Sequence, residues 1–165
     1  MCPTPRKLNW LGCLLGVLLA WAGGLPAVQA QVPSLLIGKW EVRQISFIAD
    51  RAVPDSILHQ MDNPQVAALN NEIRDGAAHL VVEFRADGTY LFVLTNAGRV
   101  ERTEHGTYAV HDHTLLGQSP TTEGGSSFND QHLERLTRRT LIVTFQAGPE
   151  LPDVLEEVEY HRLTP

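Results

Sequence analysis

Apolar and polar residues alternate along most of the chain from residue 36 onward, and turn-forming residues interrupt the alternation at short intervals. In the stretch KWEVR, for example, Trp40 and Val42 share one face and the charged residues share the other. A period of two is typical of antiparallel β-strands that have one buried and one exposed face. The pattern predicts about eight strands, near residues 36–47, 80–85, 89–95, 99–110, 114–118, 132–137, 140–146 and 154–163.

Short turn sequences join the predicted strands. Asp87-Gly88 suits a tight hairpin, because both residues tolerate a positive φ angle. Further turns are expected at residues 96–98, 111–113 and 138–139. The stretch SPTTEGGSSFND, residues 119–130, is polar and rich in glycine and serine, so we expect a mobile loop that does not pack.

One segment departs from the β pattern. Between the first two strands, residues 54–76 carry apolar side chains spaced three and four apart, which predicts two short helices. Asn63 can cap a helix that begins at Pro64, and Gly76 can end that helix in a left-handed conformation. Neither helix is long or apolar enough to be more than an amphipathic cover.

Sequential antiparallel strands leave two open edges unless the first and last strands pair. About eight such strands with short connections close naturally into an up-and-down barrel. We therefore predict an all-β antiparallel barrel with a short helical pair between the first and second strands. Trp40 follows Gly38, where the backbone can come close, and is expected to plug the closed end of the barrel. Arg162, in the last strand, is expected to lie over the indole face.

The first thirty residues have the order of a secretory signal peptide. Basic residues come first, an apolar run over residues 8–22 follows, and small residues lead to Ala30. We expect cleavage after Ala30 and export of residues 31–165 as a single domain, to the periplasm or out of the cell. A membrane anchor is the alternative, but the apolar run is shorter than the roughly 20 residues that a span requires. The tripeptide LGC at 11–13 suggests a lipoprotein site, although most of the apolar segment follows its cysteine.

The composition of the chain argues against several classes of function and partner. Both cysteines lie in the predicted leader, so the exported part has no disulfide, thiol nucleophile or cysteine metal site. Its net charge is −8, because the chain carries −6 and the leader contributes only Arg6 and Lys7. An acidic chain without basic clusters argues against nucleic acid and anionic membranes as partners. The sequence has neither a glycine-rich phosphate loop nor a GxSxG motif, so we expect no cofactor and no enzymatic activity.

The stretch HDH, residues 111–113, contains the only closely spaced pair of histidines. In an extended strand His111 and His113 face the same way and can share a zinc or copper ion. The favoured interpretation is a polar hairpin tip, because a site with two histidines and no third ligand binds a metal weakly.

The long fourth strand supplies the candidate ligand contacts. Tyr108 is expected to face inward, and a period of two carries that face back to Glu104 and Arg102. Charges inside a barrel are costly unless they are paired or hydrated. In one interpretation Arg102 fixes a ligand carboxylate or hydroxyl; in the other the strand bulges or passes the rim, and both charges lie in water. The predicted ligand contacts are Arg102, Glu104, Tyr108 and Tyr90.

Five stretches, LIGKWEV, FRADGTYLF, EHGTYAVHDHTLL, LERLTRRTLIV and YHRL, follow one another in an order that resembles bacterial lipocalin-like domains, small exported barrels of the lipocalin and calycin group. The resemblance covers about residues 36–163. It implies an antiparallel barrel with Trp40 at its base, Arg162 close to it, and a small apolar ligand inside. The chain lacks the disulfides of secreted animal lipocalins. Its helical pair is more similar to that of the intracellular fatty-acid-binding branch, where such a pair covers the portal.

Three functions remain open from the sequence. The leading prediction is an exported protein that holds one apolar or amphipathic small molecule in the barrel. The alternative is a ligand-free barrel, acting as an envelope interaction or structural protein, because an eight-stranded lumen can be filled by its own side chains. Large residues expected to face inward are Phe84, Phe92, Tyr108, Phe145 and Tyr160. An enzyme is the least favoured function, since it requires convergent polar groups with shifted pKa values.

Overall fold

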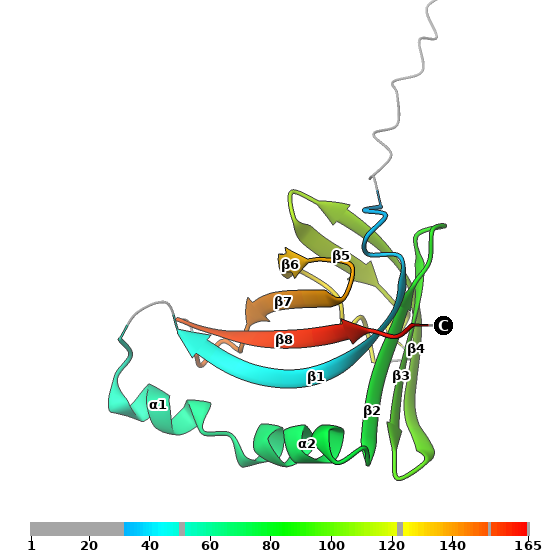
Figure 1. Ribbon diagram of the computed structural model, residues 1–165. Helices are drawn as coiled ribbons and strands as arrows, with labels where there is room; N and C mark the ends of the chain where they lie inside the picture. Colours follow the sequence, from blue (N-terminus) through cyan, green and yellow to red (C-terminus); the bar gives the residue numbers. More distant parts are fainter. Residues whose placement is uncertain (1–31, 50–51, 122–123, 152, 165) are drawn as a thin grey trace, which may run out of the picture.

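Eight antiparallel strands form one closed barrel in the order β1 to β8, and β1 pairs with β8 (Figure 1). The computed structural model describes residues 32–49, 52–121, 124–151 and 153–164. The strands are β1 Gly38–Ala49, β2 Ala78–Phe84, β3 Thr89–Asn96, β4 Arg99–His111, β5 Thr114–Gln118, β6 Gln131–Leu136, β7 Thr140–Gln146 and β8 Val154–Arg162. The predicted all-β barrel is therefore confirmed. The predicted signal peptide, residues 1–30, and its alternatives lie outside the described residues.

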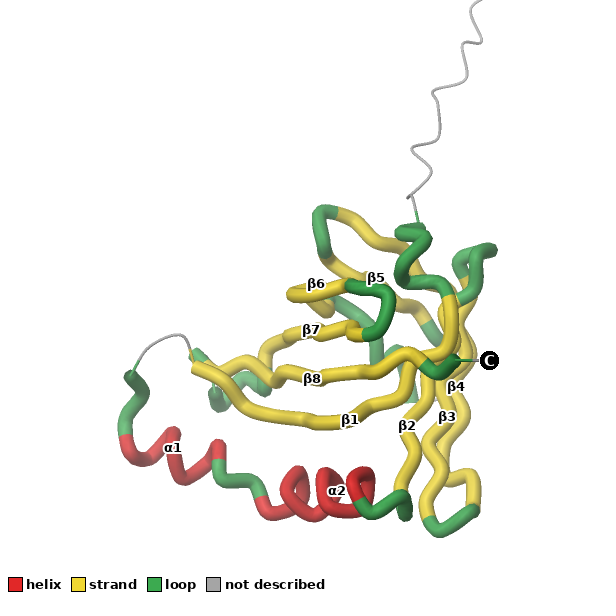
Figure 2. The backbone as a smooth tube through the Cα atoms, viewed as in Figure 1, coloured by secondary structure: helices red, strands yellow, loops and turns green. Residues whose placement is uncertain are grey.

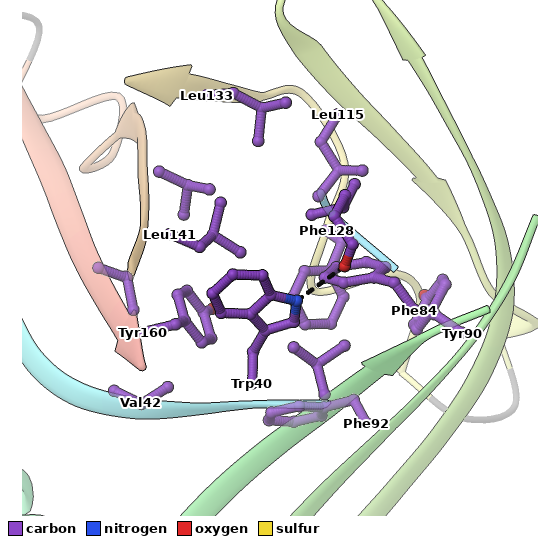
Figure 3. Packing of buried hydrophobic residues seen from close by; sticks show 14 of the residues in the cluster. Trp40, Val42, Phe84, Tyr90, Phe92, Leu115, Phe128, Leu133, Leu141 and Tyr160 are labelled. Atoms are coloured by element: carbon purple, nitrogen blue, oxygen red, sulfur yellow. Dashed lines mark hydrogen bonds between the residues drawn. The ribbon is translucent and has the colours of Figure 1, made fainter. Parts of the chain in front are cut away.

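Trp40 lies at the end of the barrel where β1 begins, and its side chain is 0% exposed. Its indole Nε1 donates a hydrogen bond of 2.7 Å to the carbonyl oxygen of Leu36, so its only polar atom is satisfied. Figure 3 shows the indole packed among buried side chains that include Val42 and Tyr160. The prediction of a Trp plug is confirmed.

Arg162 covers the indole, as predicted. Its guanidinium carbon lies 4.1 Å from the ring centroid of Trp40, within the range of a cation–π contact. The same guanidinium donates hydrogen bonds to the carbonyl oxygens of Leu35, Ile37 and Arg138. Gly38 makes room for this arrangement, because a Cβ atom there would lie 2.2 Å from Arg162 Nη1. One side chain thus ties the start of β1 to the β6–β7 turn.

Two helices, α1 Asp55–Met61 and α2 Pro64–Arg74, connect β1 to β2. They lie along one side of the barrel (Figure 2), and α2 packs next to β1 and β2. The predicted cap is confirmed, since Asn63 Oδ1 accepts hydrogen bonds from the amides of Gln65 and Val66. Gly76 follows α2 with a φ of 74°, the predicted left-handed residue. Neither described helix combines the length and the apolar character needed to cross a membrane.

Helix α2 does more than cover the barrel, because it also forms hydrogen bonds with the backbone of β1 at Ile45. Pairing between β1 and β2 ends at Glu41 and Val81, yet β1 continues to Ala49. Asn70 on α2 meets this strand, accepting from the Ile45 amide at 2.9 Å and donating to the Ile45 carbonyl at 2.7 Å. An amide side chain thereby takes the place of a neighbouring strand, which protects an otherwise open edge.

Candidate functional site

The inner face of the barrel has two halves of different character. Around Trp40 the inward side chains are almost fully buried, among them Val82, Phe84 and Leu141. Toward the opposite ends of the strands, several inward side chains keep partial exposure to solvent, although Ala78 and Val154 there are buried. We call this region the helix-side half, defined by the inner-face residues Phe47, Leu80, Leu94, Phe145 and Glu156. The α2 side chains Val66 and Leu69 pack against the same core.

Aromatic rings, here called the aromatic layer, pack together in the buried half near Trp40 (Figure 3). Phe128 is 2% exposed, and its ring centroid lies 5.5 Å from Phe84, 5.1 Å from Tyr90 and 5.6 Å from Phe92. All three contacts are edge-to-face, the arrangement that aromatic quadrupoles favour. Phe128 belongs to the β5–β6 connection, so this connection contributes to the core.

The prediction that residues 119–130 do not pack is therefore wrong for their described part. The amide of Gly117 donates to the carbonyl of Phe128 at 2.9 Å, which holds the connection against β5. Ser126 and Ser127 are also engaged in hydrogen bonds inside the barrel. The composition of this segment is that of a loop, but one large apolar side chain and two serines anchor it.

Glu104 is the centre of a buried polar cluster, and its residue exposure is 0%. Oε1 accepts from the Tyr90 hydroxyl at 2.5 Å and from the Ser127 amide at 2.9 Å. Oε2 accepts from Arg102 Nη2 and from the Ser127 hydroxyl, each at 2.7 Å. A buried carboxylate is tolerated only when it is paired and hydrogen bonded, and these four donors meet that condition.

Tyr90 links this cluster to the aromatic layer. Its hydroxyl also lies 2.8 Å from the Ser126 hydroxyl. Burial and the bond to Glu104 raise the pKa of Tyr90 to about 12, so the phenol stays protonated and acts as a donor at neutral pH. The ring fits because Gly106 stands opposite on β4, where a Cβ atom would lie 2.5 Å from Tyr90 Cε1.

The structure brings three of the four predicted ligand contacts together, namely Arg102, Glu104 and Tyr90. The interpretation that both charges lie in water is wrong for Glu104. Tyr108 is inward and buried as predicted, but its hydroxyl donates to the carbonyl of Arg85 at 2.7 Å, away from the cluster. Burial, with a contribution from the charge of Asp87, raises the pKa of Tyr108 to about 12. Ligand contact by these residues stays a prediction.

Two buried polar atoms beside the cluster lack hydrogen-bond partners among the described residues. They are Nε of Arg102 and Oε1 of Gln131. The Arg102 side chain remains 39% exposed although one of its amino groups pairs with Glu104. Of the predicted contacts, Arg102 is therefore the one with donor capacity left, because Glu104 and Tyr90 are committed to internal bonds.

Glu156 was missed as a site residue. It shares the inner face of β8 with Val154, Val158 and Tyr160, which are all buried. Burial raises the pKa of its carboxyl above the usual value. Within the described residues the structure shows no hydrogen bond or ion pair for this side chain. The alternation Val154, Glu156, Val158 in the sequence is the signal that could have identified it.

The HDH stretch forms the β4–β5 turn, with φ of 46° at Asp112 and 63° at His113. His111 lies 3.2 Å from the Asp112 carboxylate, with both side chains largely in solvent. His113 and His132 have ring centroids 6.5 Å apart. Over the described ranges no three His, Cys, Asp or Glu side chains gather in a way that could hold a metal ion.

No protein-family model matches the chain, and no curated protein matches its sequence.

Proposed function

We propose that the protein binds one small apolar or amphipathic molecule in the helix-side half of the barrel, and that it does so after export. The observation that supports this proposal is the difference in solvent exposure between the inward side chains of the two halves. Side chains around Trp40 fill the lumen, whereas inner-face apolar residues such as Phe47, Leu80 and Leu94 remain partly accessible to solvent. Apolar surface that is concave, internal and accessible is where small ligands bind proteins.

The route of entry is proposed between β1 and β2. Strand pairing there stops at Glu41 and Val81, and only α2 bridges the remainder of β1. Displacing one short helix breaks fewer backbone hydrogen bonds than parting two paired strands, so this side is the easiest to open. The resemblance to lipocalin-like domains and to the fatty-acid-binding branch supports the same proposal, and export rests on the leader sequence alone.

The hydrogen bonds and the protonation of the buried polar groups favour ligand binding over catalysis. The carboxylate of Glu104 and the hydroxyl of Tyr90 are bonded to each other and to the β5–β6 connection. The raised pKa values of Tyr90 and Tyr108, about 12 in each case, make both phenols poor proton acceptors near neutral pH. We therefore propose that the protein is not an enzyme.

A ligand-free barrel is the second candidate, and the packing of Phe128 favours it. That residue occupies part of the barrel interior with a side chain of the protein itself. In this case the protein acts through its outer surface, and the helix-side half binds nothing.

The two candidates separate in a dye-displacement experiment. Nile red, a neutral solvatochromic dye, is added to the exported protein and then displaced with dodecan-1-ol, while native mass spectrometry of the same sample detects any co-purified molecule. The binding proposal predicts saturable dye emission, displacement by the alcohol, and one ligand per chain. Absence of both saturable dye emission and a mass increment contradicts it.

A matched pair of variants locates the bound dye. Leu94 is on the inner face of β3 and its neighbour Val93 is on the outer face. Leu94→Trp is expected to occupy the helix-side half and abolish binding, whereas Val93→Trp adds the same side chain outside and leaves binding intact. Equal binding by the two variants would place the dye elsewhere on the protein.

A further inference from the structure

Glu156 occupies a specific place in the helix-side half. In the register of the sheet it lies directly between Phe47 on β1 and Phe145 on β7. Directly opposed residues on antiparallel strands have their Cβ atoms about 5 Å apart on the same face. A carboxylate is therefore flanked on both sides by phenylalanines, on the accessible part of the inner surface.

Among the described residues, none pairs its charge with Glu156. The register places Arg102, Glu104 and Glu156 on the inner face of the described strands, with Arg99 and Arg162 on the same face at the two ends of the barrel. Arg162 is held over Trp40, and Arg99 is exposed at the β3–β4 turn. Arg102 pairs with Glu104 through a contact of 2.7 Å, and these two charges offset each other. The carboxylate of Glu156 makes no ion pair or hydrogen bond with any described residue, so it remains available to a ligand.

We propose that the amphipathic ligand carries a protonated amine, with Glu156 accepting its N–H groups and Phe47 and Phe145 on either side of the cation. This inference rests on the proposed binding function and specifies the ligand class for the same site. It differs from the expectation that Arg102 fixes a ligand carboxylate, because the charge of Arg102 is offset by Glu104 and an anion near Glu156 is repelled.

The chemistry of the three side chains suits an ammonium head group. A carboxylate forms short charge-assisted hydrogen bonds with N–H donors. An aromatic face attracts a cation through its quadrupole, and the attraction grows when the cation leaves water. The raised pKa of Glu156 fits a carboxyl that lacks a positive neighbour in the unliganded protein. An alkyl chain attached to the amine would extend along Leu80 and Leu94.

The test compares three ligands with the same chain length by isothermal titration calorimetry, below their aggregation concentrations. Dodecylamine, dodecan-1-ol and dodecanoate are titrated at neutral pH into the exported protein. Dodecylamine is expected to bind at least about tenfold more tightly than the alcohol, the gain of one charge-assisted hydrogen bond. Dodecanoate is expected to bind more weakly than the alcohol.

Glu156→Gln removes the charge and keeps the shape of the side chain. It is expected to reduce the affinity for dodecylamine to that for dodecan-1-ol while the affinity for the alcohol is unchanged. Glu157→Gln is the matched control, since Glu157 is the next residue and faces outward. It removes the same charge from the acidic protein and is expected to leave the preference for the amine intact.

The outcomes distinguish this inference from the proposed function. If the alcohol binds but the amine binds no more tightly, or if Glu156→Gln and Glu157→Gln weaken amine binding equally, the amine inference is overturned and the binding function stands. If none of the three ligands binds, the proposed function fails and the inference fails with it.

Discussion

Replacing Glu104 by glutamine tests whether the buried cluster holds the β5–β6 connection in the barrel. The carboxylate accepts four hydrogen bonds, two at each oxygen. A glutamine amide group presents N–H donors to two of those donors, and it no longer balances the charge of Arg102. Losing a hydrogen bond to a charged group costs about 1.5–3 kcal/mol, and leaving a second donor unsatisfied costs about 1–3 kcal/mol. Because the Ser127 hydroxyl can rotate and Arg102 is 39% exposed, we expect the lower part of the summed range, about 2.5–4 kcal/mol.

Urea denaturation followed by circular dichroism measures this change. With a slope of about 1–3 kcal/mol per molar urea, the midpoint is expected to fall by about 1 M or more. Limited proteolysis is expected to cut residues 119–130 faster in Glu104→Gln. Glu101→Gln, an exposed change on the same strand, is expected to stay within about 0.5 kcal/mol of the wild type. The reasoning is refuted if Glu104→Gln is as stable as this control and equally resistant to protease.

Three further changes test other parts of the structure. Trp40→Ala is expected to lower the free energy of unfolding by about 3–5 kcal/mol, because it empties the closed end under Arg162; a loss below about 1 kcal/mol in urea denaturation would contradict the plug. Glu156→Gln is expected to be more stable than the wild type at neutral pH. The folded protein raises this pKa, so wild-type stability falls as the pH rises from the ordinary value of 4.5 through the folded pKa. Thermal melts from pH 3.5 to 7 should show the difference between the two proteins vanish at the acidic end, and a constant difference would exclude this cause. Asn70→Ala is expected to cost about 1–3 kcal/mol and to speed hydrogen exchange at the Ile45 amide, whereas unchanged exchange would show that α2 does not protect this edge.

The overall architecture was predictable because it depends on periodic features. The alternation of apolar and polar residues predicted the strands. Because the turns between the strands are short, closing the sheet into a barrel was the simplest way to remove its two open edges. The helix end signals also act locally, so Asn63 and Gly76 were identified correctly from their neighbours alone. The approach of Arg162 to Trp40 followed from placing the last strand beside the first.

The interior was only partly predictable, because it depends on single residues in long-range contact. Phe128 lies in a segment whose overall composition is that of a loop. An interpretation based on composition therefore overlooks this single large apolar side chain. Glu104 and Arg102 were expected on the inner face. The hydrogen bonds that Ser127 and Tyr90 donate to Glu104 could not be predicted, because they depend on how the β5–β6 connection folds. These contacts join residues from 2 to 23 positions apart, and no local pattern encodes the more distant ones.

The bridging role of Asn70 escaped prediction for a related reason. On a surface helix an asparagine is normally solvated, and its partner is the backbone of Ile45, whose amide has no sequence signature. The backbone of Ile45 needs such a partner because β1 no longer pairs with β2 after Glu41.

Nuclear magnetic resonance of the exported protein with methyl labels tests the central claim most directly, by titration with dodecan-1-ol. Occupation of the helix-side half predicts saturable shifts at the methyl groups of Leu80 and Leu94, with the Trp40 indole N–H unchanged. Shifts confined to the outward methyl groups of Val81 and Val93, or no saturable shift at all, would contradict a ligand site inside the barrel.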